Sequence, residues 1–211
     1  MSSNEFNIES DADKVSYGLG LQLGNQIVQQ SFPGFSLDAL IIGIKDIYAN
    51  QPCRFPDEEM QQAFATINQM VQAQASQAGE QNHQAGEVFL AENAKKDGVT
   101  TTASGLQYEV ITAGDGPKPS ETDMVVTHYH GMLVDGTVFD SSVDRGEPAQ
   151  FPVNGVIQGW IEALQMMNVG SKWRITVPAP LAYGEAGSGP VIEPKCTLVF
   201  EVELLAITGD A

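Results

Sequence analysis

The amino-acid sequence predicts an α+β protein with an all-helical first part, a long linking helix, and a bent antiparallel β-sheet packed on one short helix. Two observations predict this fold. Apolar residues recur at helical spacing before Gly98, whereas short β-like segments separated by turns follow it. Only one short helical stretch, Gln158–Met167, lies among those β segments. The three parts are therefore expected at residues 1–55, 56–97 and 98–211.

The first helix is expected over Asp13–Gln30, where apolar residues recur every four positions: Val15, Leu19, Leu23 and Ile27. The segment GLGLQLG within it also alternates like a strand, but the apolar stripe continues at helical spacing beyond the glycines. A glycine inside a helix costs about 1 kcal/mol relative to alanine. Gly20 and Gly24, four residues apart, therefore indicate a place where another helix comes very close.

A second helix is expected to follow Ser36, whose side chain can accept a backbone N–H at the helix start. Its broad apolar face contains Leu37, Leu40, Ile41, Ile44, Ile47 and Tyr48. Two short helices and the base of a third are too few to cover both apolar faces within one chain. We therefore expect a homodimer with a two-fold interface, formed by Gly20, Leu21, Gly24, Ile41 and Ile44 among others.

The third helix is expected to begin at Pro56, and the acidic residues Asp57, Glu58 and Glu59 suit the positive end of its dipole. Its first turns carry an apolar stripe that would pack in the helical domain. Residues 72–87 remain compatible with a helix but show no apolar face, which is typical of a helix that bridges two bodies through solvent. A flexible glutamine-rich linker is the alternative, and Gly79 and Gly86 favour it.

The sequence pattern after Gly98 predicts strands joined by turns. Asp135 and Gly136 stand between two strand segments, and this pair favours a tight hairpin because both turn residues need positive φ. The single short helix carries Trp160 in its first turn. Packing of this helix on the sheet would bury the indole at least in part.

Charge and composition exclude several classes of function. The chain has 27 Asp and Glu against 10 Lys and Arg, a formal net charge of −17, so a nucleic-acid partner is not expected. No segment is apolar enough to span a membrane, and the first residues lack the features of a secretion signal, so we expect a cytoplasmic protein without membrane association. Cys53 and Cys196 have no paired spacing and are expected to be free thiols.

The residues of the predicted strands do not indicate a metal site or a catalytic nucleophile. His128 and His130 share one strand face, but no Cys, Asp or Glu joins them at ligand spacing, so neither a metal nor a cofactor is expected. Ser141 and Ser142 lack a histidine in an activating motif. What remains is a group of aromatic residues near neighbouring strand and helix ends: Tyr129, Phe139, Phe151, Trp160, Tyr183 and Phe200. An apolar hollow lined by them would suit a proline ring.

Five segments carry a resemblance to a known family: VVTHYHGMLVDGTVFDSS, GVIQGWIEAL, MNVGSKWRITVP, LAYGEAGSG and TLVFEVELL. In order and spacing they resemble the FK506-binding-protein class of peptidyl-prolyl cis-trans isomerases, and the resemblance covers Thr102–Ile207. The helical first half is similar to the dimerisation domain of bacterial two-domain members related to the macrophage infectivity potentiator. The resemblance implies an enzyme that accelerates rotation about X-Pro peptide bonds during protein folding.

The resemblance also implies a role for each site residue. The proline pocket would have Trp160 as its floor and Tyr129, Phe139 and Phe200 as walls, with Phe151 beside them. Val156 and Ile157 would form the rim, the backbone N–H of Ile157 and the hydroxyl of Tyr183 would bind substrate carbonyls, and Val191 and Ile192 would close the rim. Asp140 and Arg145 would form the polar corner. The function of Asp140 stays open: it could orient Tyr129 or simply pair with Arg145.

Strand geometry adds one requirement to this pocket. Alternation along a strand would send Phe139 and Asp140 to opposite faces of the sheet, so both can reach one pocket only at a bulge or a strand end. The mechanism needs no nucleophile, because a dry aromatic pocket that disfavours the planar amide lowers the barrier to rotation.

The expected partners are proline-containing unfolded or partly folded proteins and macrocyclic inhibitors of the FK506 type. Ala149, Ser188 and Glu193 depart from the family pattern at the rim, so weaker inhibitor binding is expected. The competing hypothesis is a chaperone that binds unfolded polypeptides without catalysing isomerisation. Chaperone activity of a dimeric helical domain is also compatible with catalysis.

Overall fold

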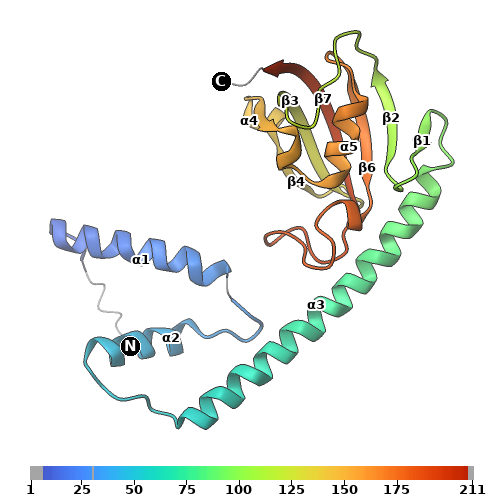
Figure 1. The fold of residues 1–211 in the computed structure, drawn as a ribbon. Coiled ribbons are helices and arrows are strands. Elements are labelled where there is room, and N and C mark those ends of the chain that lie inside the picture. Colours follow the sequence, from blue (N-terminus) through green and yellow to red (C-terminus); the bar gives the residue numbers. More distant parts are fainter. Residues whose placement is uncertain (1–6, 30, 209–211) are drawn as a thin grey trace. The chain divides into compact units, whose positions relative to one another are not determined.

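The computed structural model describes residues 7–29 and 31–208 and divides the chain into two compact units, residues 1–73 and 74–211 (Figure 1). The first unit is helical, and the second contains the sheet. The division falls within one long helix rather than at the expected boundaries 55/56 and 97/98. The reason is that the second half of this helix packs on the sheet.

Unit 1 contains α1 (Asp11–Gln29), α2 (Leu37–Tyr48) and the start of α3 (Asp57–Asn93). The expected end of the first helix, Gln30, lies outside the described residues. Ser10 begins α1 with a reciprocal cap, because its hydroxyl accepts the N–H of Asp13 at 3.1 Å and the Asp13 carboxylate accepts the N–H of Ser10 at 3.0 Å. Ser36 caps α2 as expected, accepting the N–H of Ala39 at 3.2 Å.

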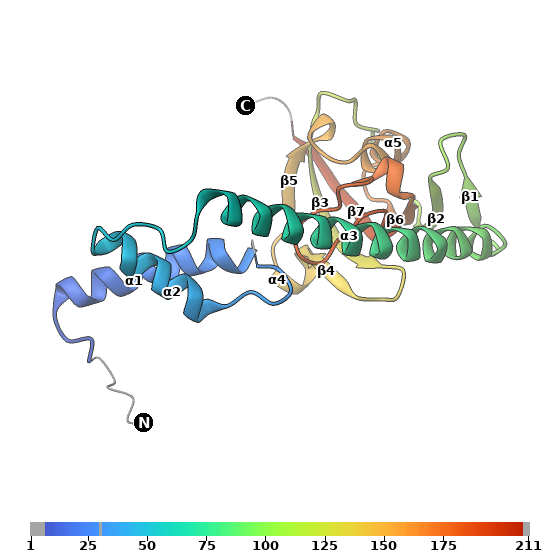
Figure 2. The ribbon, with the colours of Figure 1, turned by 90° about the horizontal axis from the view of Figure 1, so that it is seen from below.

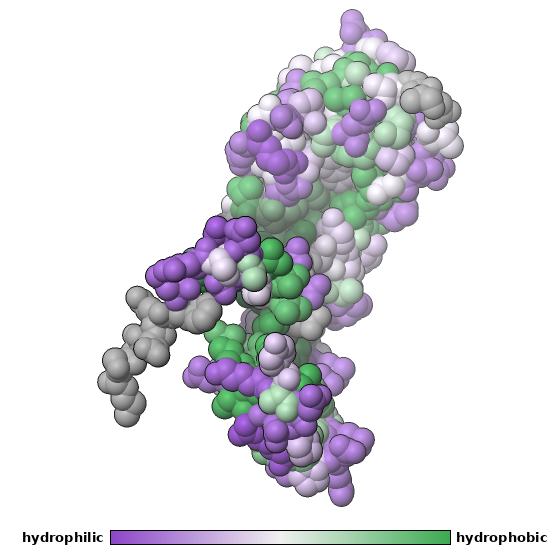
Figure 3. All heavy atoms as spheres, turned by 90° about the vertical axis from the view of Figure 1, so that its left-hand side faces the viewer, coloured by the Kyte–Doolittle hydropathy of each residue, from purple (hydrophilic) through white to green (hydrophobic). Residues whose placement is uncertain are grey.

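The apolar faces of unit 1 are uncovered in the single chain. Among residues 7–28 and 31–73, whose side chains the structure describes, none is buried. The exposed side chains include those of Leu19, Leu21, Leu23, Ile41, Ile44 and Ile47. Figure 3 shows such hydrophobic side chains gathered on the surface of the helices. The helical patterns of the sequence are therefore present, but they build no core within one chain.

Helix α3 is unbroken over 37 residues, so Gly79 and Gly86 do not interrupt it and a continuous helix, not a flexible linker, joins the two parts of the sequence. Within unit 2, the face of α3 that carries Gly79, Gly86 and Asn93 is buried. These three residues recur every seven positions, and therefore lie on one side of the helix.

This buried face corrects the expectation that residues 72–87 are solvated on every side. A Cβ atom at Gly86 would lie 2.4 Å from Thr197 Oγ1, and one at Gly79 would lie 3.2 Å from the Cβ of Pro194. Asn93 Nδ2 donates to Gln107 Oε1 at 2.8 Å. In Figure 2 this half of α3 runs along the side of the sheet. Small residues, which a search for apolar periodicity overlooks, make the contact.

Unit 2 is a single antiparallel sheet with the strand order β1-β2-β6-β7-β3-β4, and β5 pairs with the other part of β3. Its strands are β1 (Val99–Thr101), β2 (Gln107–Thr112), β3 (Met124–Leu133), β4 (Val138–Ser141), β5 (Ala149–Pro152), β6 (Lys172–Val177) and β7 (Leu198–Thr208). The helices among them are α4 (Ser142–Arg145) and α5 (Gln158–Met166), and two 3₁₀ turns cover Val153–Gly155 and Ala179–Leu181. The predicted fold class is confirmed.

The core lies between α5 and the sheet. Leu164 and Met167 at the end of α5 are fully buried, as are Ile175 on β6 and Leu198 and Leu204 on β7. Gly159 lets α5 come close to β6, because a Cβ there would lie 2.5 Å from Val177 Cγ1. This contact brings the next residue, Trp160, directly onto the sheet.

The α3 contact generates a stability prediction. An alanine in place of an exposed helix glycine would stabilise the helix by about 1 kcal/mol. Gly86→Ala is instead expected to lower the free energy of unfolding by about 1–3 kcal/mol, because the new methyl group overlaps the Thr197 hydroxyl. Urea denaturation of the full chain measures it. The double variant Gly86→Ala with Thr197→Ala should recover part of the loss, and stabilisation by Gly86→Ala alone would contradict the contact.

Candidate active site

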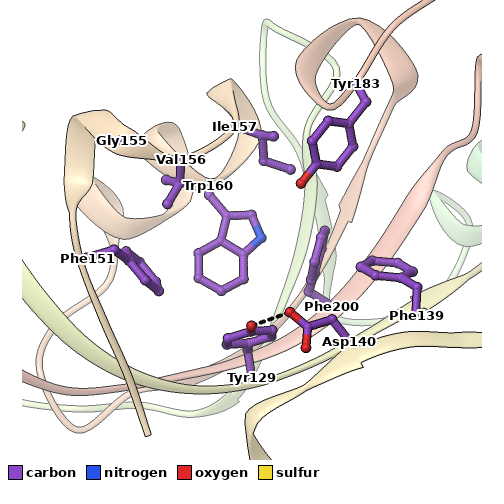
Figure 4. Close-up of a pocket in the computed structure, with 10 residues that line it drawn as sticks. All are labelled: Tyr129, Phe139, Asp140, Phe151, Gly155, Val156, Ile157, Trp160, Tyr183 and Phe200. Carbon is purple, nitrogen blue, oxygen red and sulfur yellow. Dashed lines mark hydrogen bonds between the residues drawn. The ribbon is translucent and has the colours of Figure 1, made fainter. Parts of the chain in front are cut away.

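A cavity of about 370 Å³ opens in unit 2 between α5 and the sheet (Figure 4). Most of its lining is aromatic or aliphatic. Its walls come from β3, β4, β5, β7, the entrance of α5 and the loop after β6: Tyr129, Phe139, Asp140, Phe151, Gly155, Val156, Ile157, Trp160, Tyr183 and Phe200. Nine of these ten residues belong to the predicted site, and Gly155 is the addition.

Trp160 occupies the centre of the aromatic group. Its side chain is only 5% exposed, and its ring meets those of Tyr129, Phe151 and Phe200 edge to face, with centroids 5.5, 5.5 and 5.3 Å apart. Edge-to-face contacts place the positive rim of one ring on the negative face of the next, so they fix ring orientation as well as burying area. The indole is thus a rigid floor held from three sides.

A β-bulge brings Phe139 and Asp140 to the same cavity. Gly131 of β3 pairs with Asp140, but the next residue, Met132, pairs with Val138, so Phe139 is the extra residue on β4. The bulge rotates the strand locally and lets two consecutive side chains reach one side. Gly131 leaves room for this arrangement, since a Cβ there would lie 2.8 Å from the Phe139 ring. The expected bulge is therefore present.

The polar corner consists of Tyr129, Asp140 and Arg145. The Tyr129 hydroxyl donates to Asp140 Oδ2, and Arg145 donates to Asp140 Oδ1 and, at 3.0 Å, to the Tyr129 hydroxyl oxygen. Asp140 therefore orients the tyrosine and pairs with the arginine at the same time, through different oxygens. Arg145 does not line the cavity itself. It acts on the cavity through its two partners.

These contacts shift the protonation equilibria of the corner. Burial raises the pKa of Asp140, but the hydrogen bonds from Tyr129 and Arg145 outweigh burial and hold this pKa below its ordinary value. Burial, followed by the hydrogen bond to Asp140, raises the pKa of Tyr129. The corner is therefore a neutral tyrosine, a carboxylate and a guanidinium over the whole physiological range.

The rim is formed at the entrance of α5 and by Tyr183. Ile157 is the N-cap of α5, and the first N–H groups of a helix have no acceptor within it. Val156, just before it, also lines the cavity. Tyr183 is 40% exposed, and Figure 4 shows its hydroxyl directed into the cavity above Trp160. Backbone and hydroxyl donors thus stand at the mouth of an apolar hollow.

Val191 and Ile192 do not line this cavity, in contrast to the expected closure of the rim. Ser188 and Ile192 form an isolated bridge, in which the Ser188 N–H donates to the Ile192 carbonyl at 2.7 Å. Ile192 is 7% exposed and belongs to the core, whereas Val191 is 40% exposed. The bridge turns the segment back on itself, and of the two side chains one is buried in the core and the other is exposed to solvent.

The two strand histidines are held by serine hydroxyls. His128 Nδ1 lies 3.1 Å from Ser142 Oγ, and His130 Nδ1 lies 2.9 Å from Ser141 Oγ. In the described part of the chain no three His, Cys, Asp or Glu side chains are grouped closely enough to hold a metal ion. Among the same residues, no helix combines the length and apolar character that crossing a membrane requires.

Comparison with known proteins identifies the family of this chain. Residues 116–205 match the family model described as FKBP-type peptidyl-prolyl cis-trans isomerase, and residues 12–110 match the domain amino-terminal to it. The FKBP-type 22 kDa peptidyl-prolyl cis-trans isomerase of Escherichia coli (strain K12) is 51% identical over 92% of this chain and 94% of its own length. The chain belongs to the FKBP-type peptidyl-prolyl cis-trans isomerases.

Further relatives match this FKBP-type isomerase over most of its length. The outer membrane protein MIP of Legionella longbeachae is 39% identical over 95% of this chain and 87% of its own length. The crystal structure of FkpA from Escherichia coli matches with a TM-score of 0.69 and 38% identity, and covers 96% of this chain and 99% of that one. The predicted family, and with it the isomerase activity, is confirmed.

The polar corner of this FKBP-type isomerase generates a pH prediction. A carboxylate whose pKa is lowered on folding adds stability that is present above the pKa of the unfolded state and is lost as the pH falls through the lower, folded value. The unfolding free energy of the wild type minus that of Asp140→Asn should therefore decline as the pH is lowered from about 5 towards 2. Denaturant titrations at each pH measure this difference.

Glu147→Gln, which removes an exposed carboxylate just after α4, is the matched control for this titration. It reports the effect of removing a carboxylate that lies outside the polar corner. A difference between wild type and Asp140→Asn that is the same at every pH would show that Asp140 gains nothing from Tyr129 and Arg145.

Proposed function

We propose that the cavity over Trp160 binds the proline of an X-Pro bond and that rotation about this bond is catalysed there. The observation that carries the proposal is the combination of an aromatic floor and walls with hydrogen-bond donors at the rim. A proline ring is compact and apolar, and its preceding carbonyl needs a donor. The cavity offers both kinds of contact within one site.

Catalysis in this cavity follows from the electronic structure of the amide. Resonance between nitrogen and carbonyl sets a barrier of about 18–20 kcal/mol to rotation. The planar amide is more polar than the twisted one, so a cavity lined by Phe139, Phe200 and Trp160 favours the twisted form. Holding the ring in place while the preceding carbonyl turns lowers the barrier without any covalent step.

Tyr129 and Tyr183 make different hydrogen bonds in the proposed site. Tyr129 has one hydroxyl proton, which it donates to Asp140, and its oxygen accepts from Arg145. Tyr183 directs its hydroxyl into the cavity, and we assign it the bond to a substrate carbonyl. The N–H of Ile157 at the start of α5 would bind a second carbonyl and so fix the chain on both sides of the proline.

The pocket assignment predicts a loss of activity from Phe139→Ala and from Phe200→Ala. Isomerisation of a short X-Pro peptide should slow well over tenfold, each tenfold corresponding to about 1.4 kcal/mol of barrier. Phe139→Ala is the cleaner variant, because Phe139 is partly exposed whereas Phe200 is buried in the core. Phe89→Ala, an aromatic residue of α3 outside the cavity, is the control. Wild-type rates in both pocket variants would refute the site.

We also propose that the chain forms a homodimer through unit 1, and that the paired helices hold client polypeptides. The apolar faces of α1 and α2 are exposed in the single chain, so a partner with an apolar surface is needed to cover them. A second copy of the chain supplies such a surface. An added Cβ at Gly20 or at Gly24 would meet nothing in the single chain, so space remains for a close approach from outside. The proposed clients are unfolded or partly folded proteins that contain proline.

The dimer proposal predicts a variant that separates the two activities. Ile44→Glu places a charge in the exposed apolar face of α2 and should convert a particle of about twice 22.6 kDa into a monomer in light scattering. Short peptides should still be isomerised at the wild-type rate, but refolding of a proline-limited protein should slow several-fold. Lys45→Glu, at the next position of α2, is the control. A monomeric wild type, or unimpaired refolding by monomeric Ile44→Glu, would contradict the proposal.

Two expectations remain proposals about the same protein. Macrocyclic inhibitors of the FK506 type would bind the cavity over Trp160. Ala149, Ser188 and Glu193, which differ from the family pattern, would weaken this binding. Competition between an inhibitor and an X-Pro peptide tests this proposal. The cytoplasmic location stays a prediction, which fractionation of the source cells would test.

A further inference from the structure

The loop between Tyr183 and β7 returns to its own starting point. The N–H of Lys195 donates to the carbonyl of Gly184 at 2.8 Å, and the N–H of Gly184 donates to the carbonyl of Ala179 at 2.9 Å. The closed base of the loop therefore lies beside Tyr183, the residue that directs its hydroxyl into the cavity. The loop base is thus hydrogen-bonded to the residue that follows Tyr183 in the chain.

Three glycines and one lysine of this loop have a backbone in the left-handed region. Gly184, Gly187 and Gly189 all adopt positive φ, which alanine or larger residues rarely do. Lys195 has a φ of 60°, although it carries a side chain. A backbone of this kind persists only where surrounding contacts determine it. The hydrogen bond to Gly184 is one such contact of Lys195.

Helix α3 contacts the same segment through Asn82. The Asn82 amide nitrogen donates to the Pro194 carbonyl at 3.1 Å and to Glu193 Oε2 at 3.1 Å. Gly79, one turn earlier, lets the helix approach, because the position of a Cβ there is already 3.2 Å from the Cβ of Pro194. Both amide protons of Asn82 are thus used on the two residues that precede Lys195.

We propose that Asn82 is a positioning residue for catalysis, which fixes Tyr183 through Pro194, Lys195 and Gly184. The inference rests on the proposed proline pocket and extends it to a residue of the linking helix. Asn82 is not among the residues that line the cavity, and its amide donates to Glu193 and Pro194. Its contribution is to keep the base of the loop, and with it the Tyr183 hydroxyl, in the position that meets a substrate carbonyl.

A double-mutant cycle with the full chain tests the proposal. Asn82→Ala should lower kcat/KM for a short X-Pro peptide about three- to tenfold, the range expected from loss of an orienting hydrogen bond. Gln81→Ala, the exposed neighbour on α3, should leave it unchanged. In a Tyr183→Phe background, Asn82→Ala should have almost no further effect, because the hydroxyl that it positions is already absent.

A charge exchange at the same contact supplies an independent readout. Asn82→Asp keeps the size of the side chain but places a carboxylate against Glu193, so it should lower kcat/KM at least as much as Asn82→Ala. Adding Glu193→Gln restores a donor to this pair and should recover part of the loss. A purely structural role would instead change the thermal midpoint in all variants without this recovery.

The outcomes separate this proposal from the pocket assignment. Additive effects of Asn82→Ala and Tyr183→Phe, or no effect of Asn82→Ala, would overturn the positioning role and leave the pocket intact. Wild-type rates in Phe139→Ala and Phe200→Ala would overturn the pocket itself. A non-additive cycle together with recovery by Glu193→Gln supports the positioning role.

Discussion

The close contact between α5 and β6 at Gly159 is the constraint on which the catalytic unit depends. Without a side chain at this position the helix packs closely on the Val177 side chain of β6, and the next residue, Trp160, is buried against the sheet. The aromatic rings from β3, β5 and β7 then have a common surface to pack against. A bulkier residue at Gly159 would overlap Val177 and displace α5, which carries Trp160, from β6.

Departures from regular pairing give the site its chemistry. The bulge at Phe139 sends an apolar wall and an acid to the same side, and α4 begins directly after β4. This sequence of bulge, strand end and short helix brings Arg145 back to Asp140 five residues later. A charged pair is thus placed at the edge of an apolar hollow, where solvent still reaches the guanidinium and the hollow itself stays free of unpaired charge.

The sequence predicts most of this fold because its signals are local. Helical spacing and the Ser36 cap each depend on a few neighbouring residues, and the aromatic group followed from residue type. The turn at Asp135-Gly136 is present, but only Gly136, with a φ of 90°, has the positive φ that was expected of both residues. Contacts between distant segments were harder to predict. The buried face of α3 consists of glycines and an asparagine, which no apolar pattern reports, and the inward turn of Ile192 depends on a bridge to Ser188. A seven-residue recurrence of small residues was the available signal for the α3 contact.

The absence of buried side chains among residues 7–28 and 31–73 gives the two halves of the chain different controls on their stability. Isolated helices of 19 and 12 residues are only marginally stable in water. Contacts within the single chain do not bury the apolar faces of α1 and α2. In the proposed homodimer their folded population rises with the concentration of the chain, as for any linked binding equilibrium. The catalytic unit has its own core and is indifferent to dilution. On dilution, the proposed dimer would therefore lose order first in α1 and α2, while the cavity stays intact.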